Sequence, residues 1–258
     1  MIEQLQASLH RLREKKPLVL CLTNHVSVEF VANCLLAVGA LPLMSESMDE
    51  LSDLMAISQS LLINIGTLDA AFMSKAYQAA TIARAMDLPL ILDPVGVGAS
   101  QFRTHFAQSL LPFASIIRGN ASEIMALAGD HAESRGVDST QSVSSAQIAA
   151  QSLADKQVIM VSGEVDYLCH KQQQYQIPFG SSIMPKITGM GCSLTASIAA
   201  FAATDGDLLQ ATLMAGCFFA LCGQVVAQQC STPGTFRQLF IDQLFQPDWN
   251  RIKKVAGE

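Results

Sequence analysis

The sequence of 258 residues is poor in charged side chains and has no run of basic ones. Lysine, arginine, aspartate and glutamate make up 15% of it and hydrophobic residues 50%, which excludes extended disorder and predicts a sizeable buried core. The formal net charge is −6, so the chain lacks the basic surface that nucleic acids and anionic membranes require. We expect neither as a partner.

A Cys-x-x-Cys pair is also absent, and the seven cysteines are odd in number. No secretory signal pattern stands at the N-terminus, so we expect reduced, mostly buried thiols in a cytoplasmic protein. The most apolar stretch, residues 211–227, is short for a membrane span and contains Gln224. This stretch predicts a buried core helix.

No internal repeat and no long linker divide the chain, which predicts a single domain over residues 1–258. Short, continuous apolar segments alternate with helical patterns, as is typical of an α/β protein with a mostly parallel sheet between two layers of helices. The last two strand patterns predict an antiparallel hairpin at the end of the sheet. The expected strands are residues 18–22, 41–44, 61–65, 90–93, 115–118, 158–161, 165–169 and 175–178.

Helical patterns fill most intervals between these strands. Ser47 and Glu50 have the spacing of a capping box, and so do Asn120 and Glu123. Residues 129–140 are polar and predict an exposed loop. The expected helices are residues 26–38, 47–58, 69–86, 101–111, 121–128 and 144–155, and the chain after residue 192 is expected to be nearly all helical.

The most informative segment is Thr188-Gly189-Met190-Gly191-Cys192, which precedes a run of good helix formers. Free N–H groups and the helix dipole make helix N-termini binding sites for anions, and glycine lets the backbone approach a phosphate closely. A cysteine in the first turn stands where a thiolate is favoured. We interpret Gly189 and Gly191 as an oxyanion cradle and Cys192 as a candidate reactive side chain.

Polar residues follow several expected strands, in segments 23–25, 93–98, 118–123 and 162–164. Ligands of open α/β sheets bind beyond the carboxyl ends of the strands, so these residues and the glycine loop are expected to converge there. Asp93 and Glu123 are candidates to hold Mg²⁺ through water, since this ion typically takes one or two carboxylates. Arg118 offers a positive fork for phosphate oxygens. Together they describe phosphoryl transfer, which depends on positioning and charge neutralisation.

Several motifs in combination resemble the hydroxyethylthiazole kinase family of the ribokinase-like group. They are Asn120-Ala-Ser-Glu123, Asp93-Pro-Val-Gly96, Thr23-Asn24 with Ala32-Asn33 and Gly39-Ala40, and the Gly-x-Gly-Cys loop. The resemblance runs from about residue 17 into the helix after Cys192, and more weakly beyond it. It implies a three-layer α/β/α ribokinase-like fold. It also implies an enzyme that uses ATP and Mg²⁺ to phosphorylate the primary alcohol of 4-methyl-5-(2-hydroxyethyl)thiazole in thiamine biosynthesis and salvage.

The same resemblance assigns roles to individual residues and to the assembly. Catalysis falls to the loop residues Cys192, Gly189 and Gly191. Substrate contacts are implied for Asn24, Val26, Met44 and Gly189, ATP contacts for Arg118, Ser162 and Asn120, and metal binding for Asp93 and Glu123. The family forms homotrimers with active sites between subunits, so residues 25–44 of one chain are expected to complete a neighbour's site.

Two positions depart from the family pattern. Met190 stands between the loop glycines where a small threonine is usual, and Ser162 stands in place of a threonine but keeps the hydroxyl. Relatives in the wider ribokinase-like group have an aspartate base where this chain has Cys192. A thiolate can serve as a base, although a carboxylate is more completely ionised at neutral pH.

Plainer interpretations remain open at the level of the sequence. Glu123 fits a capping box alone, Asp93-Pro94 fits a simple turn, and Cys192 fits an inert buried thiol. His25 fits a polar residue at the end of a strand, and Met44 fits a core residue. Three other functions are compatible with the motifs: a ribokinase-like kinase of a pyrimidine or sugar alcohol, an acyl hydrolase with Cys192 as nucleophile, and a binding protein without turnover.

Overall fold

A single eight-stranded sheet organises the computed structural model, which describes residues 1–129 and 139–258. Its strands are β1 (Leu18–Leu22), β2 (Leu41–Met44), β3 (Ser60–Asn64), β4 (Leu90–Asp93), β5 (Ile116–Asn120), β6 (Val158–Ser162), β7 (Asp166–His170) and β8 (Gln173–Ile177). The order in the sheet is β2-β1-β3-β4-β5-β6-β7-β8, parallel from β2 to β6, with β7 and β8 added antiparallel. The predicted hairpin at the edge of the sheet is thus confirmed.

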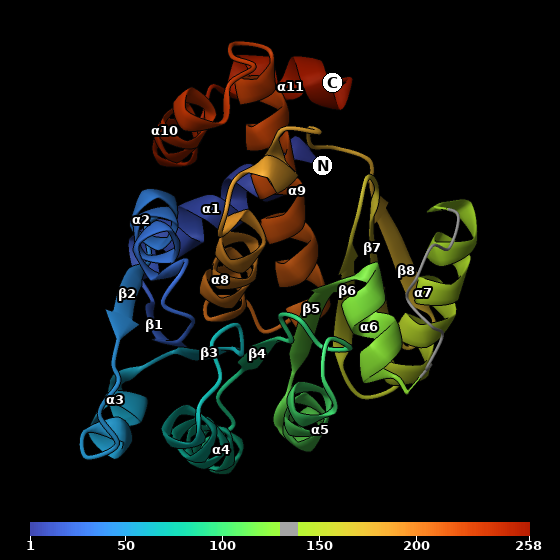
Figure 1. Cartoon of the computed structure of the whole chain (residues 1–258). Coiled ribbons are helices and arrows are strands. Elements are labelled where there is room, and N and C mark those ends of the chain that lie inside the picture. The colour runs from blue at the N-terminus through green and yellow to red at the C-terminus, as the bar shows by residue number, and fades with distance from the viewer. Residues whose placement is uncertain (130–138) are drawn as a thin grey trace.

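Helices cover both faces of the sheet. They are α1 (Ile2–Lys15), α2 (Val28–Val38), α3 (Leu51–Ile57), α4 (Ala70–Ala85), α5 (Gln101–Leu110), α6 (Ala121–Leu127), α7 (Ser139–Leu153), α8 (Met190–Ala202), α9 (Leu208–Ala227), α10 (Pro233–Phe245) and α11 (Trp249–Ala256). Figure 1 shows α8 and α9 on one side of the sheet and α4 and α5 on the other. The predicted three-layer α/β/α fold is confirmed.

The alternation of side chains along β1 explains why both faces need cover. Val19 and Cys21 join the core beneath α8 and α9, whereas Leu20 and Leu22 join a second core on the opposite face. Strands β3 and β4 are buried along their whole length. Continuous apolar runs are therefore required in the centre of this sheet.

Helix α9 is long and apolar enough to cross a membrane by length and composition alone, but 83% of its apolar window is buried inside the structure. It packs against α8, α10 and α11 (Figure 1). This placement is that of the core helix predicted from residues 211–227.

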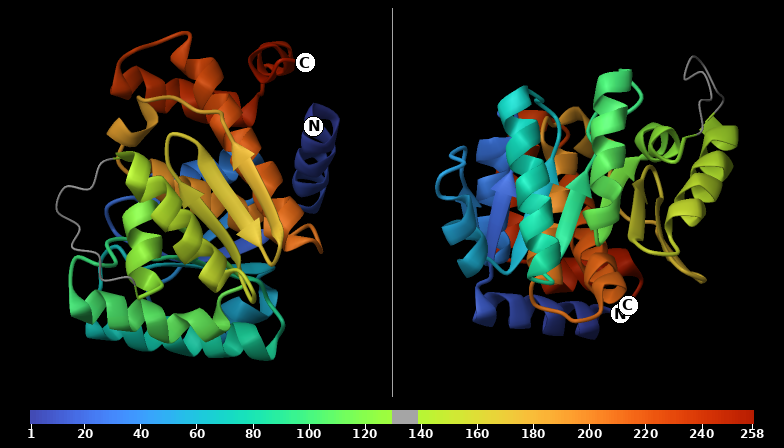
Figure 2. Two further views of the ribbon diagram at one scale, coloured as in Figure 1. Left: turned by 90° about the vertical axis from the view of Figure 1, so that its right-hand side faces the viewer. Right: turned by 90° about the horizontal axis from the view of Figure 1, so that it is seen from below.

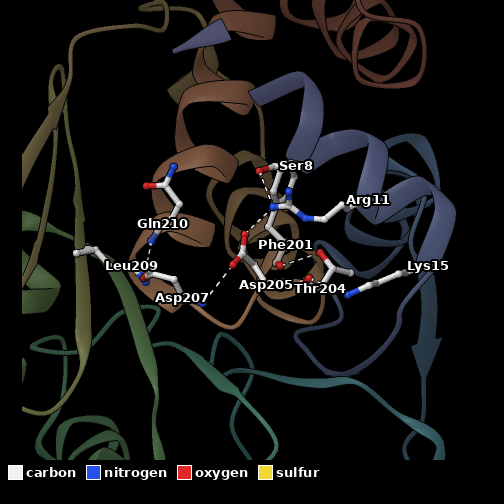
Figure 3. A network of polar contacts seen from close by, with 9 residues as sticks. All are labelled: Ser8, Arg11, Lys15, Phe201, Thr204, Asp205, Asp207, Leu209 and Gln210. Atoms are coloured by element: carbon white, nitrogen blue, oxygen red, sulfur yellow. Dashed lines mark hydrogen bonds and ion pairs between the residues drawn. The ribbon is translucent and has the colours of Figure 1, made fainter. Parts of the chain in front are cut away.

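The sequence patterns did not predict α1, whose apolar side chains face the core. Arg11 forms an ion pair with Asp205 at 2.7 Å, and Lys15 donates to the Thr204 carbonyl at 3.1 Å, both in the turn between α8 and α9 (Figure 3). The Met1 amine lies 3.4 Å from the Glu258 carboxylate, so the two ends of the chain are neighbours (Figure 2). Helix α1 therefore closes the α8–α9 side of the molecule.

Two local predictions were wrong. The capping box of Ser47 and Glu50 does not form, because α3 begins at Leu51 and the Glu50 carboxylate accepts a hydrogen bond from the Ser45 hydroxyl. The helix expected over residues 144–155 begins at Ser139. The loop expected at 129–140 lies mostly outside the described residues.

Candidate active site

The carboxyl ends of the parallel strands β1, β3, β4, β5 and β6 lie at the same end of the sheet, and α8 packs against β1, β3 and β4. Asn64, Asp93, Asn120 and Ser162 are the last residues of their strands, and Asn24 follows β1 by two residues. The candidate residues of the sequence therefore come mainly from this end, as expected for an open α/β sheet.

Gly189 forms the N-terminal cap of α8 in a left-handed conformation, with a φ of 86°. A Cβ atom there would lie 2.9 Å from the Ser27 Cβ and 3.3 Å from the Phe30 ring. Glycine is required both by the backbone angle and by this close contact with the start of α2. It allows helix α8 to begin directly at the strand ends.

Gly191, in the first turn of α8, lies against the guanidinium of Arg118. A Cβ atom on Gly191 would come within 2.6 Å of the Arg118 Nη1. The Arg118 Nε donates to the Ser162 hydroxyl at 2.8 Å, which holds the side chain in place. Free N–H groups of a helix N-terminus and a fixed guanidinium thus adjoin, an arrangement that suits phosphate oxygens.

Asp93 is completely buried at the end of β4. Its Oδ2 accepts hydrogen bonds from the Asn64 amide at 2.7 Å and the Thr195 hydroxyl at 2.9 Å. Burial raises the pKa of Asp93 to about 6, partly opposed by the nearby charge of Arg118. Its Oδ1 has no hydrogen-bond partner among the described residues. A buried, unpaired carboxylate oxygen needs a partner that the protein itself does not supply.

Glu123 is mainly bound by backbone N–H groups. Its Oε2 accepts from the Asn120 N–H at 2.8 Å and completes a capping box, and its Oε1 accepts from the Gly96 N–H at 2.9 Å. The predicted cap is confirmed, and the same carboxylate also fixes the loop after Asp93. Each oxygen keeps a lone pair, so a contact to a metal through water is compatible with both bonds.

Asn24 and Cys192 lie in contact near the Asp93 carboxylate. The Asn24 Nδ2 is 3.5 Å from the Cys192 Sγ, and its Oδ1 accepts from the N–H and hydroxyl of Ser27 at 3.0 Å. Burial, and then the charge of Asp93, raise the pKa of the Cys192 thiol. The cysteine is consequently a thiol at neutral pH, which favours a contact role over that of a base.

The remaining predicted substrate residues lie on the outer side of the site. Val26 is 69% exposed, and Met44, in the edge strand β2, packs partly against the core. The exposed side chain of His25 lies 3.4 Å from Glu46. Because Val26 is so exposed, a substrate contact there would need a ligand or a second chain to cover it.

Three residues that matter to this geometry were not singled out from the sequence. Asn64 and Thr195 donate hydrogen bonds to Asp93. Arg103 on α5 donates to three backbone carbonyls in the loops after β3 and β4, those of Ile65, Gly66 (3.3 Å) and Val95 (3.0 Å). Asn64 ends β3, but the apolar pattern predicted a strand over residues 61–65, so the strand-end rule did not identify it. Arg103 carries no sequence signal, because its partners are backbone carbonyls distant in sequence.

The residues at this end of the sheet are compatible with Mg²⁺. Among the described residues no group of three or more histidine, cysteine or acidic side chains could enclose a metal. Mg²⁺ does not need such a cage, since it keeps several waters and commonly takes one or two carboxylates plus phosphate oxygens. The unpaired Oδ1 of Asp93 fits that requirement.

Comparison with known proteins identifies the family. The model of the hydroxyethylthiazole kinase family matches residues 9–248. The hydroxyethylthiazole kinase of Chlamydia felis is 40% identical, with 100% of both chains covered. The structure of the hydroxyethylthiazole kinase protein from Pyrococcus horikoshii is 31% identical, with a TM-score of 0.87 over 98% of this chain and 96% of the other.

A more distant neighbour shows how far the fold extends. Pyridoxal kinase of Bacillus subtilis, in its ADP complex, has a TM-score of 0.61 at 15% identity and covers 80% of this chain and 91% of its own. At that identity the likeness concerns the ribokinase-like fold alone. The family match over most of the chain and the full-length relatives lead to one conclusion: this chain belongs to the hydroxyethylthiazole kinase family.

Proposed function

We propose that this single-domain chain transfers the γ-phosphoryl group of ATP to the primary alcohol of 4-methyl-5-(2-hydroxyethyl)thiazole, as the names of its relatives indicate. The observation that carries the proposal is the contact between Gly191, at the N-terminus of α8, and the guanidinium of Arg118. Phosphoryl transfer needs charge neutralisation around the moving group more than covalent help. This pair provides it beside Asn24, a buried polar residue.

Each polar group of the site has a distinct part in this reaction. The N–H groups at the start of α8 and the Arg118 guanidinium stabilise charge that develops on the transferred phosphoryl oxygens. Ser162 holds Arg118, and Asn120, whose Oδ1 caps α6, keeps its amide N–H groups for the nucleotide. Asn24, Gly189 and Cys192 orient the alcohol, with Val26 and Met44 on the outer side.

Asp93 and Glu123 are the residues that would hold Mg²⁺, through water. The ion supplies positive charge to the phosphate oxygens when it is bound. Asp93 is ionised only above a pH of about 6, because burial raises its pKa to about 6. The carboxylate required by the site is therefore available at neutral pH.

We also propose that the protein is a cytoplasmic homotrimer. Strand β2 is an edge strand, and Val26, Leu36 and Leu41 around it are 69%, 53% and 45% exposed. A neighbouring chain on this edge would cover these side chains and enclose the outer side of the site at Val26 and Met44. Sedimentation equilibrium tests the assembly, and a mass equal to one chain of 27.6 kDa would contradict it.

A panel of alcohols tests the proposed substrate. With ATP and Mg²⁺, we expect ADP release coupled to the thiazole alcohol and little release with a hydroxymethylpyrimidine or with ribose. Preferential turnover of the pyrimidine or the sugar would instead indicate another ribokinase-like kinase. Binding of the thiazole without ADP release would indicate a binding protein.

Cys192→Ala is expected to reduce kcat by less than about tenfold, since loss of a general base typically costs at least about 100-fold. The reason is the raised pKa of Cys192, which keeps the thiol protonated at neutral pH. Cys230→Ala, three residues after the end of α9, is the control. A larger loss of steady-state kcat in Cys192→Ala than in Gly191→Val would identify the sulfur as a base or nucleophile.

Glu123→Gln is expected to lower the free energy of unfolding by about 1–2 kcal/mol, because one of the two N–H bonds of the carboxylate is lost. We also expect a higher Mg²⁺ concentration for half-maximal activity. Asp207→Ala, which removes the cap of α9, is the stability control. An unshifted Mg²⁺ titration would restrict Glu123 to its structural role.

A further inference from the structure

We propose that Asn64 is a positioning residue that couples the alcohol-binding side of the site to Asp93. Its amide is completely buried at the end of β3 and lies between two groups with different tasks. On one side is Asn24, which contacts Cys192, and on the other is the carboxylate of Asp93. The inference rests on the proposed function and gives a role to Asn64, to which the proposed function assigns none.

The hydrogen bonds of Asn64 fix the direction of its amide. Its Oδ1 accepts from the Asn24 Nδ2 at 2.9 Å and from the Gly66 N–H at 3.0 Å, while its Nδ2 donates to the Asp93 Oδ2 at 2.7 Å. A carboxylate can only accept, and an N–H can only donate, so a flipped amide would lose all three bonds. The amide therefore has one orientation.

This orientation determines which oxygen of Asp93 is available. Asn64 from β3 and Thr195 from α8 both donate to Oδ2, and Oδ1 keeps no partner among the described residues. Two donors on one oxygen prevent the carboxylate from rotating freely. Without Asn64 the carboxylate can turn, and the oxygen that the reaction uses is no longer defined.

The same amide holds Asn24 on the alcohol side. Asn24 donates to Asn64 and accepts from Ser27, so both ends of its amide are fixed. The turn after β3 packs closely on it, since a Cβ atom on Gly66 would lie 2.8 Å from the Asn24 Cβ. Loss of Asn64 removes the acceptor that orients the Asn24 Nδ2 toward the position of Cys192.

Replacement by leucine, which keeps the branching at Cγ but removes the hydrogen-bonding groups, tests the coupling. We expect Asn64→Leu to lower kcat by about 100-fold, the cost of a misplacement of about 1 Å. The dissociation constant of the thiazole alcohol, measured by calorimetry without nucleotide or metal, is expected to rise about tenfold. The KM for ATP is expected to stay within about threefold of wild type, because Arg118 and the start of α8 are unchanged.

Ser60→Ala is the matched control, since Ser60 is completely buried at the other end of β3 and its hydroxyl has no partner among the described residues. It is expected to retain wild-type constants. Asn64→Ser, which is smaller, serves if the leucine variant fails to fold, and the thermal midpoint of each variant monitors folding. A loss confined to the midpoint, with kcat and thiazole binding unchanged, would overturn the proposal.

A double-mutant cycle separates coupling from independent effects. If Asn64 acts through Asn24, the kcat/KM for the thiazole in the double variant Asn24→Ala, Asn64→Leu should lie within about threefold of Asn64→Leu alone. Multiplication of the two single losses would overturn the coupling. Wild-type protein that forms no ADP with the alcohol would contradict the proposed function instead, so the two failures are distinguishable.

Discussion

Replacement of Gly191 by valine is expected to reduce kcat by about 100- to 1,000-fold, the range typical for loss of an oxyanion-stabilising donor. A single Cβ atom at this position would lie 2.6 Å from the Arg118 Nη1 and 3.3 Å from its Cζ. The branched side chain would displace the guanidinium from the start of α8 and cover the N–H groups. Both sources of positive charge at the transferred phosphoryl group are then lost together.

Gly234→Val is the matched control for this variant. Gly234 is also the second residue of its helix, α10, and a Cβ atom there would have no atom within 4 Å. Comparison of the two variants separates the change in helix propensity from the change in the site. Unchanged kcat in Gly191→Val, or an equal loss in Gly234→Val, would contradict the anion-site interpretation of the glycine loop.

Asp93→Asn is expected to abolish most turnover, with a loss of about 1,000-fold or more, and at the same time to stabilise the protein. Burial raises the pKa of Asp93 from 3.8 to about 6, so the ionised carboxylate opposes folding above pH 6. One pKa unit corresponds to about 1.4 kcal/mol, which gives a gain of up to about 3 kcal/mol on removal of the charge. Function and stability therefore have opposite requirements at this position.

The stability difference between wild type and Asp93→Asn depends on pH, because the pKa of Asp93 is raised in the folded state. Because the folded state holds the proton of Asp93 more tightly, the wild-type protein loses stability as pH rises from about 4 to about 6, and the asparagine variant lacks this contribution. We expect urea unfolding to give a higher free energy for the variant at pH 8 and similar values at pH 4. Wild-type kcat should fall as pH drops through about 6. A less stable variant at pH 8 would contradict the description of Asp93 as a buried carboxylate whose charge opposes folding.

The sequence predicted which polar residues gather at the carboxyl ends of the parallel strands, because that placement depends on local rules. Polar residues after apolar strands identified Asn24, Asp93 and Arg118, and the paired glycines identified the start of α8. The spacing of Asn120 and Glu123 correctly predicted a capping box. These features depend on neighbours in sequence, and the structure agrees with them.

Features that depend on contacts between distant segments could not be predicted in this way. Arg103 joins loops after two different strands through backbone carbonyls, which leave no trace in residue type. The capping box at Ser47 and Glu50 failed because Glu50 bonds to Ser45 instead. The apolar pattern placed Asn64 inside a buried strand, whereas its proposed role depends on side-chain hydrogen bonds to Asn24 and Asp93, which are distant in sequence.

Transfer of label from ATP to the thiazole alcohol tests the central claim most directly. With ATP labelled with ³²P at the γ-position, Mg²⁺ and the purified chain, we predict a labelled thiazole phosphate in a one-to-one ratio with ADP. The Gly191→Val variant should form this product far more slowly, and the Gly234→Val variant at the wild-type rate. Label found only in inorganic phosphate, or absent from the thiazole while ADP accumulates, would contradict phosphoryl transfer to this alcohol.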